Sequence, residues 1–157
     1  MEVTFWPQNK RLALSLVVNV EEGSELSIVE GDKGPEPVDE LGVVLKKPIR
    51  NYGNESNYLY GIKRGAPRIM SLLERYKLRA TFTAAARSLE LYPDLAKQIV
   101  SGGHEVCSHG WRWVHQFHMN EDQENAGNNC KKFNTYQVKI HNADCFQVYN
   151  VYELHWG

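Results

Sequence analysis

The sequence has few cysteines and almost no net charge. Cys107, Cys130 and Cys145 are an odd number without a CxxC spacing, which argues against a disulfide framework and favours reduced thiols in a cytoplasmic protein. The net charge of −1 provides no field that would attract nucleic acid or an anionic membrane surface. Neither kind of partner is therefore expected.

The chain also lacks an apolar segment long enough to span a bilayer. Its clearest apolar run, residues 12–20, follows Lys10-Arg11, contains Ser15 and ends in Glu21-Glu22. A spanning helix needs about 20 apolar residues, and a signal peptide ends in a small-residue cleavage site. We interpret residues 12–20 as a strand buried on both faces.

What the sequence does contain is typical of one soluble α/β domain, with 157 residues of which 42% are hydrophobic. Strands are expected over residues 12–20, 80–84 and 104–107, and helices over 67–77 and 93–100. Gly102-Gly103 should end the second helix. Residues 21–60, rich in Gly and Pro, are expected to form a long functional loop. This order of elements predicts a parallel sheet with helices outside.

After residue 124 the βα pattern stops. Residues 125–157 are rich in Asn, Gln and Tyr, and the stretches 135–140 and 146–152 alternate apolar and polar side chains as the strands of a hairpin do. We therefore divide the chain into an α/β part over residues 1–124 and a tail over residues 125–157.

Side chains capable of acid–base chemistry follow two of the predicted strands. Glu21 and Glu22 follow the first strand, and His109 follows the third. Catalytic residues of parallel α/β folds collect at the carboxyl ends of the strands, so these groups should meet in space. They could activate water or hold a substrate, although a carboxylate pair at a strand end is often only a solvated pair.

The run from Gly103 to Trp113 holds several further polar and aromatic residues. His104 is at the opposite end of its strand from the candidate site and is expected to be structural. Cys107 is expected to be a small buried hydrophobic residue. Trp111 and Trp113 could line a substrate pocket, or could pack in the core as most tryptophans do.

A metal site is not predicted. A catalytic zinc needs about three protein ligands and an open position, and Glu22 and His109 provide only two. The position four residues after His109 holds Trp113, which cannot coordinate. His115 and His118 lie further along, so a zinc or other divalent ion completed by one of them is the alternative.

Four motifs occur in order along the chain. They are Asn19-Val20-Glu21-Glu22-Gly23, Glu55-Ser56-Asn57-Tyr58-Leu59-Tyr60-Gly61, Arg79-Ala80-Thr81-Phe82 and the run Gly103 to Trp113. Together, over roughly residues 5–124, they resemble the polysaccharide deacetylase family (carbohydrate esterase family 4), and more narrowly its allantoinase-like branch. The resemblance implies a (β/α) barrel that hydrolyses non-peptide C–N bonds, and its allantoinase-like branch implies a cyclic amide of purine catabolism as substrate.

The resemblance also implies roles for individual residues. Glu21 and Glu22 replace the Asp-Asp pair of metal-dependent members, where the first Asp is the base and the second binds metal. His109 matches the first of two ligand histidines, and Trp113 replaces the second, as expected of a branch with an incomplete metal site. Catalysis is thus assigned to Glu21, Glu22 and His109. The residues expected to shape or close the pocket are Glu55, Tyr58, Trp111, Arg112 and Trp113.

The extent of the resemblance raises alternatives. A complete barrel needs about 200 residues or more, and no further βα unit is evident after residue 124, so we expect a truncated barrel with an unmatched tail. The main expectation is hydrolysis of a small amide without a metal cofactor. The alternatives are metal-dependent N-deacetylation of chitin or a related N-acetylated polysaccharide, and a non-catalytic fragment. The sequence leaves open whether the chain forms a homo-oligomer.

Overall fold

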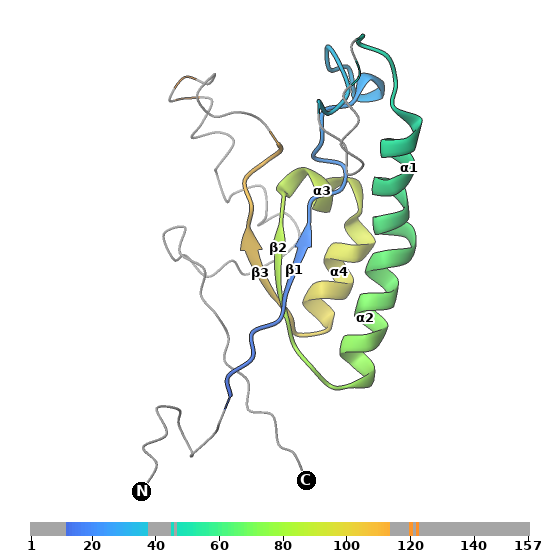
Figure 1. The fold of residues 1–157 in the computed structure, drawn as a ribbon. Coiled ribbons are helices and arrows are strands. Elements are labelled where there is room, and N and C mark those ends of the chain that lie inside the picture. The colour runs from blue at the N-terminus through green and yellow to red at the C-terminus, as the bar shows by residue number, and fades with distance from the viewer. Residues whose placement is uncertain (1–11, 38–44, 46, 114–119, 121, 123–157) are drawn as a thin grey trace, which may run out of the picture.

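Three short parallel strands form the sheet of this protein (Figure 1). The computed structural model describes residues 12–37, 45, 47–113, 120 and 122. Within them the strand order is β1 (Val17–Val20), β2 (Thr81–Ala84) and β3 (Glu105–Ser108). The last residue of each strand lies in the same row, so the three carboxyl ends finish level at one edge. In the described part the sheet does not close on itself, and the barrel implied by the resemblance stays a prediction.

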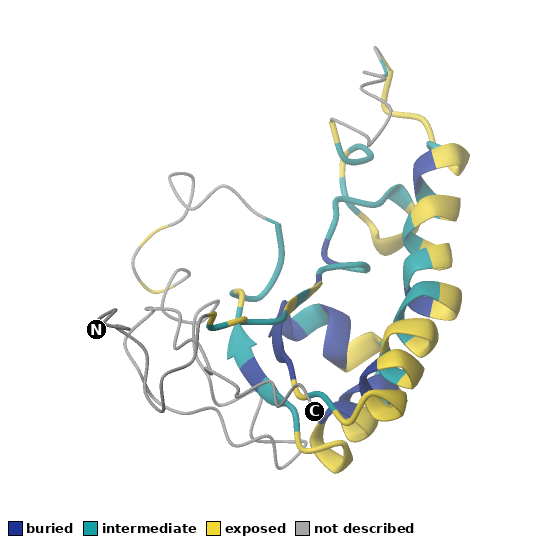
Figure 2. Ribbon diagram, turned by 60° about the horizontal axis from the view of Figure 1, so that its bottom comes forward, coloured by how far each residue is buried: buried dark blue, intermediate teal, exposed yellow. Residues whose placement is uncertain are grey.

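Helices pack along one side of the sheet (Figures 1 and 2). Before β2, one continuous rod consists of α1 (Tyr52–Tyr60), a π-helical turn (Gly61–Gly65) and α2 (Ala66–Arg75). Between β2 and β3 lie α3 (Ala86–Leu91) and α4 (Pro93–Ser101), and a 3-10 turn (Ile28–Glu30) follows β1. No helix in the described residues is both long and apolar enough to cross a membrane.

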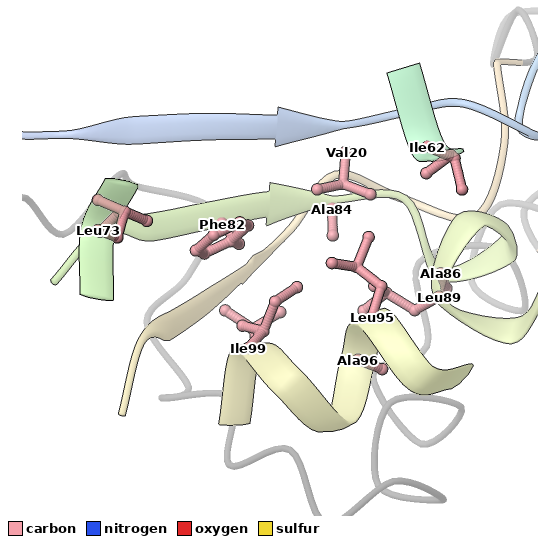
Figure 3. Close-up of a cluster of buried hydrophobic side chains, with 12 residues drawn as sticks. Val20, Ile62, Leu73, Phe82, Ala84, Ala86, Leu89, Leu95, Ala96 and Ile99 are labelled. Atoms are coloured by element: carbon pink, nitrogen blue, oxygen red, sulfur yellow. The ribbon is translucent and has the colours of Figure 1, made fainter. Parts of the chain in front are cut away.

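The core lies between the sheet and the helices. Figure 3 shows Val20, Phe82 and Ala84 of the strands pointing into the same space as Ile99 of α4 and Leu89 of α3. These side chains are at most 3% exposed. Burial of such a large apolar side chain stabilises a fold by about 1.5–3 kcal/mol, and this layer therefore fixes how the helices sit on the sheet.

Most of the predicted α/β elements are confirmed. Residues 80–84 contain β2, residues 104–107 overlap β3, and residues 93–100 lie within α4. Gly103, at the end of α4, has a φ of 70°, as predicted for the end of this helix. The short helix α3 was not predicted, because a single six-residue segment carries too little periodicity to separate it from a loop.

The predicted long loop is wrong over its last part, because α1 begins at Tyr52. The Asn51 side chain caps this helix by accepting a hydrogen bond from the Asn54 N–H at 3.1 Å. Asn54 is the one buried residue of α1, so the segment lacks the apolar stripe from which a helix is usually predicted. The helix predicted over residues 67–77 is confirmed as α2, which begins one residue earlier and continues the π-helical turn.

The predicted burial of the first strand is also wrong in part. β1 occupies only the end of residues 12–20, and the side chains of Leu14 and Val17 are exposed. The cause is position, since β1 pairs only with β2 and forms an edge of the described sheet. Cys107 is half-buried on the opposite edge strand, not fully buried as expected.

His104 precedes β3 at the amino end of the sheet, far along the strand from the candidate site. Its Nδ1 accepts the Ala80 N–H at 3.2 Å, and its ring lies 5.2 Å from that of Phe82. Burial, and then the nearby Arg79 guanidinium, lower the pKa of His104. The neutral ring is therefore the form that fits the fold.

Ile99 should contribute far more to stability than its neighbour Val100. Ile99 is 0% exposed and Val100 is 39% exposed. We expect Ile99→Ala to lower the free energy of unfolding by about 2–5 kcal/mol and the control Val100→Ala to change it by less than about 0.5 kcal/mol, measured by urea denaturation. Equal effects of the two substitutions would contradict the packing of α4 on the sheet.

Acid should destabilise the fold through His104. Because the folded state resists protonation of His104, the unfolded chain binds more protons once the pH falls below the ordinary pKa of about 6.5. The free energy of unfolding should therefore decrease as the pH is lowered through this range and be insensitive to His104 above it. His104→Asn keeps an acceptor but cannot titrate, so it should flatten the pH dependence measured by thermal denaturation; an unchanged slope would exclude His104 as the cause.

Candidate active site

Glu21 and His109 meet at the carboxyl edge of the sheet. Glu21 directly follows β1, and His109 directly follows β3. His109 Nε2 lies 3.2 Å from Glu21 Oε1. The His109 N–H donates to the Ala84 carbonyl at 3.0 Å, which extends the β2–β3 ladder by one residue and fixes the backbone of this histidine. The structure thus brings together the two strand-end groups that the sequence places apart.

A pocket of about 320 Å³ lies beside this pair. The residues that line it are Asn19, Glu21, Glu22, Asn57, Tyr58 and Trp113. Asn19 and Glu21 are two residues apart on one chain segment, and the pleat of a strand sends such side chains to the same face. The pocket therefore combines β1, the segment after it, helix α1 and the segment after β3.

Glu22 is held between its own backbone and the helical rod. Its Oε2 accepts the Glu21 N–H at 3.2 Å. Its other carboxylate oxygen lies so close to Gly61 that a Cβ at that position would overlap it. The glycine at the start of the π-helical turn therefore gives Glu22 the space it needs beside the rod.

Tyr58 and Trp113 form an aromatic wall of the pocket. Their ring centroids are 6.1 Å apart and the ring planes meet at 85°, the edge-to-face arrangement that aromatic pairs favour. Tyr58 was expected on a loop, but it lies on α1. The Trp113 N–H donates to the Ser24 carbonyl at 3.0 Å, which anchors the wall to the segment after β1.

Arg112 binds the protein itself. Its guanidinium contacts both carboxylate oxygens of Asp32, at 2.7 and 3.3 Å. It also donates to the carbonyl of Glu25 at 2.6 Å and to that of Ser24 at 3.4 Å. Arg112 was expected to contact substrate, but it does not line the pocket. We call this set of contacts the Arg112 clamp.

Asp32 is the acidic partner of the Arg112 clamp. Burial alone would raise the pKa of Asp32, but hydrogen bonds from Arg112 and from the Ser27 N–H outweigh it and lower the pKa below its usual value. In contrast, burial raises the pKa of Glu25, which lies in the same loop. The clamp thus favours the charged form of Asp32 and keeps the ion pair intact at neutral pH.

Two further residues expected to shape the pocket lie outside its lining. Glu55 pairs with Arg50 at 2.6 Å near the start of α1. Trp111 packs against the hydrophobic core, and its carbonyl accepts the Arg87 N–H at 3.1 Å. The sequence alone does not show whether a tryptophan in such a polar motif faces the core or the pocket.

Asn19 and Asn57 line the pocket but were not among the residues assigned to it. Asn19 could have been found, because strand alternation places it on the face of Glu21. Asn57 could not, since its segment was expected to be a loop and its position depends on α1.

The described residues do not form a catalytic metal site. They contain no group of three His, Cys, Asp or Glu side chains with the spacing of metal ligands. Glu21 is paired with His109, and Trp113, at the position where a ligand would be needed, packs on Tyr58. This donor set does not fit a catalytic zinc. His115 and His118 lie outside the described residues, as does the predicted hairpin.

Similar proteins of known family were found over much of the chain. The polysaccharide deacetylase family matches residues 57–140. A protein of Schizosaccharomyces pombe assigned as a polysaccharide deacetylase is 36% identical over 112 residues, which are 69% of this chain and 35% of that protein. The peptidoglycan deacetylase of Helicobacter pylori is 34% identical over 82 residues, which are 48% of this chain and 28% of that protein.

Two crystal structures share the fold. Puue allantoinase is 33% identical with a TM-score of 0.72, over 86% of this chain and 46% of that one. A Pseudomonas aeruginosa PAO1 protein assigned as a polysaccharide deacetylase is 32% identical with a TM-score of 0.75, over 86% and 47% of the two chains. This chain therefore spans about a third of the length of the curated relatives and just under half of the two solved structures.

The family match covers more than half of the 157 residues. It includes the end of α1, the elements from α2 to β3, and the segment that carries His109 and Trp113. On these grounds the chain belongs to the polysaccharide deacetylase family.

Proposed function

We propose that this chain carries the site of a hydrolase that cleaves the non-peptide C–N bond of a compact amide, as an allantoinase does. The observation that carries the proposal is the contact of 3.2 Å between His109 and Glu21 beside a pocket that both glutamates line. The similarity to Puue allantoinase over 86% of this chain supports it.

Glu21 is suited to move the proton that amide hydrolysis requires. A base must take a proton from water as the water oxygen bonds to the carbonyl carbon, and an acid must protonate the nitrogen as the C–N bond breaks. The Glu21 carboxylate can perform both steps with the same proton. His109 Nε2 can donate to this carboxylate and so hold it in place.

The other lining residues suit a small amide. Glu22 can accept a hydrogen bond from a substrate N–H, while the carboxamides of Asn19 and Asn57 supply both donors and acceptors. The volume of about 320 Å³ is at the lower end of the range for small-molecule sites, roughly 300–1,000 Å³. A compact substrate fits such a pocket better than a polymer does.

Glu21→Gln should abolish most of the activity, because glutamine cannot take a proton from water. We expect kcat/KM for allantoin to fall by about 10²–10⁴-fold, measured by the release of product. Glu90→Gln is the matched control, since Glu90 is an exposed carboxylate on α3 that pairs with Arg87, and it should leave the rate unchanged.

Two results would overturn this proposal. One is a Glu21→Gln variant that hydrolyses allantoin at the wild-type rate. The other is a wild-type chain that cleaves neither allantoin nor N-acetylated glucosamine oligomers under conditions in which a full-length relative is active. The second result would favour a non-catalytic fragment.

Removal of metal ions should leave the activity unchanged. A catalytic zinc needs about three protein ligands, and the described residues contain no group of three that could hold a metal ion. We therefore expect no loss of rate after treatment with a chelator and less than one ion per chain in elemental analysis of the untreated protein. Stoichiometric zinc together with loss of activity after chelation would favour the metal-dependent N-deacetylase instead.

A further inference from the structure

The Arg112 clamp joins the segments that follow β1 and β3. Through Asp32, Glu25 and Ser24 it holds the loop after β1 at three points. Arg112 is the immediate neighbour of Trp113, and the two residues share the Ser24 carbonyl as an acceptor. The clamp and the aromatic wall of the pocket are therefore one connected unit.

The pair formed by Glu21 and His109 is held by other contacts. The N–H of His109 bonds to β2 at Ala84, and the carbonyls of Gly110 and Trp111 accept the N–H groups of the first two residues of α3. These backbone bonds place His109 without the clamp. What Arg112 adds is confined to the next residue, Trp113, and to the loop on which that residue rests.

We propose that Arg112 is a positioning residue that holds Trp113 against Tyr58 and so sets how tightly the pocket binds substrate, without acting on the reaction of Glu21. A guanidinium has five N–H donors, which are enough for one side chain to bind a carboxylate and two carbonyls at once. The kinetic part of this inference rests on the proposed amide hydrolysis.

Loss of the clamp should weaken substrate binding but not the chemical step. We expect Arg112→Ala to raise KM for allantoin by about tenfold with kcat unchanged, the pattern of a lost uniform binding interaction. Asp32→Ala should have a similar effect, and the double variant should be no worse than the more severe single one, because Asp32 acts on Trp113 through Arg112. Arg112→Lys, which keeps the charge but not the forked geometry, should be intermediate.

Arg87→Ala is the matched control. Arg87 anchors the same loop through Glu30 at 2.7 Å and also pairs with Glu90. Its side-chain hydrogen bonds thus go to residues outside the Arg112 clamp and the aromatic wall. It should lower the melting temperature about as much as Arg112→Ala while leaving KM unchanged. An equal rise in KM for both variants, or a loss of kcat alone in Arg112→Ala, would overturn the proposal.

A spectroscopic measurement tests the clamp independently of activity. In protein labelled with 5-fluorotryptophan, the ¹⁹F resonance of Trp113 is identified by its absence from Trp113→Phe. We expect this resonance to shift toward that of solvent-exposed tryptophan in Arg112→Ala and to stay in place in Arg87→Ala. A resonance unchanged in Arg112→Ala would refute the positioning role even if the chain hydrolyses amides, and a shift would support it even if the chain does not.

Discussion

Parallel pairing with level strand ends is the constraint on which the site depends. Val20, Ala84 and Ser108 lie in one row, so whatever follows each strand emerges at the same edge. Glu21 and His109 are 88 positions apart in the chain, yet they come within 3.2 Å because each is the first residue after its strand. A shift in the register of one strand by two residues would move the backbones of Glu21 and His109 apart by about 6.6 Å along the strand direction and would break their contact.

Beyond the carboxyl edge of the sheet, the pocket is built by side-chain contacts and not by strand pairing. The pocket wall opposite the sheet comes from the helical rod, where Gly61 admits the Glu22 carboxylate and Tyr58 meets Trp113. The Arg112 clamp then ties the loop after β1 to the segment after β3. Because the contacts of the clamp are polar and half-buried, they order the loops with only a modest gain in stability, while the apolar layer between the sheet and the helices stabilises the fold.

Several differences between prediction and structure have physical causes that belong to tertiary structure. α1 is polar and mostly exposed, so its helical form depends on the Asn51 cap and on continuity with α2, not on an apolar stripe. Arg112 has the residue type of a substrate-binding group, but its partner Asp32 is 80 positions away in the chain. Only the folded loop brings this carboxylate to it.

The sequence by itself determined the parallel α/β order, the positions of β2, β3 and α4, and the two strand-end groups that form the candidate site. It could do so because apolar periodicity and glycine caps are local signals, and because chain direction in a parallel sheet decides which ends meet. The tertiary structure alone decided which motif residues face the pocket. Trp111 faces the core and Trp113 the pocket, two positions apart, because their backbones are held by different partners, Arg87 and Ser24.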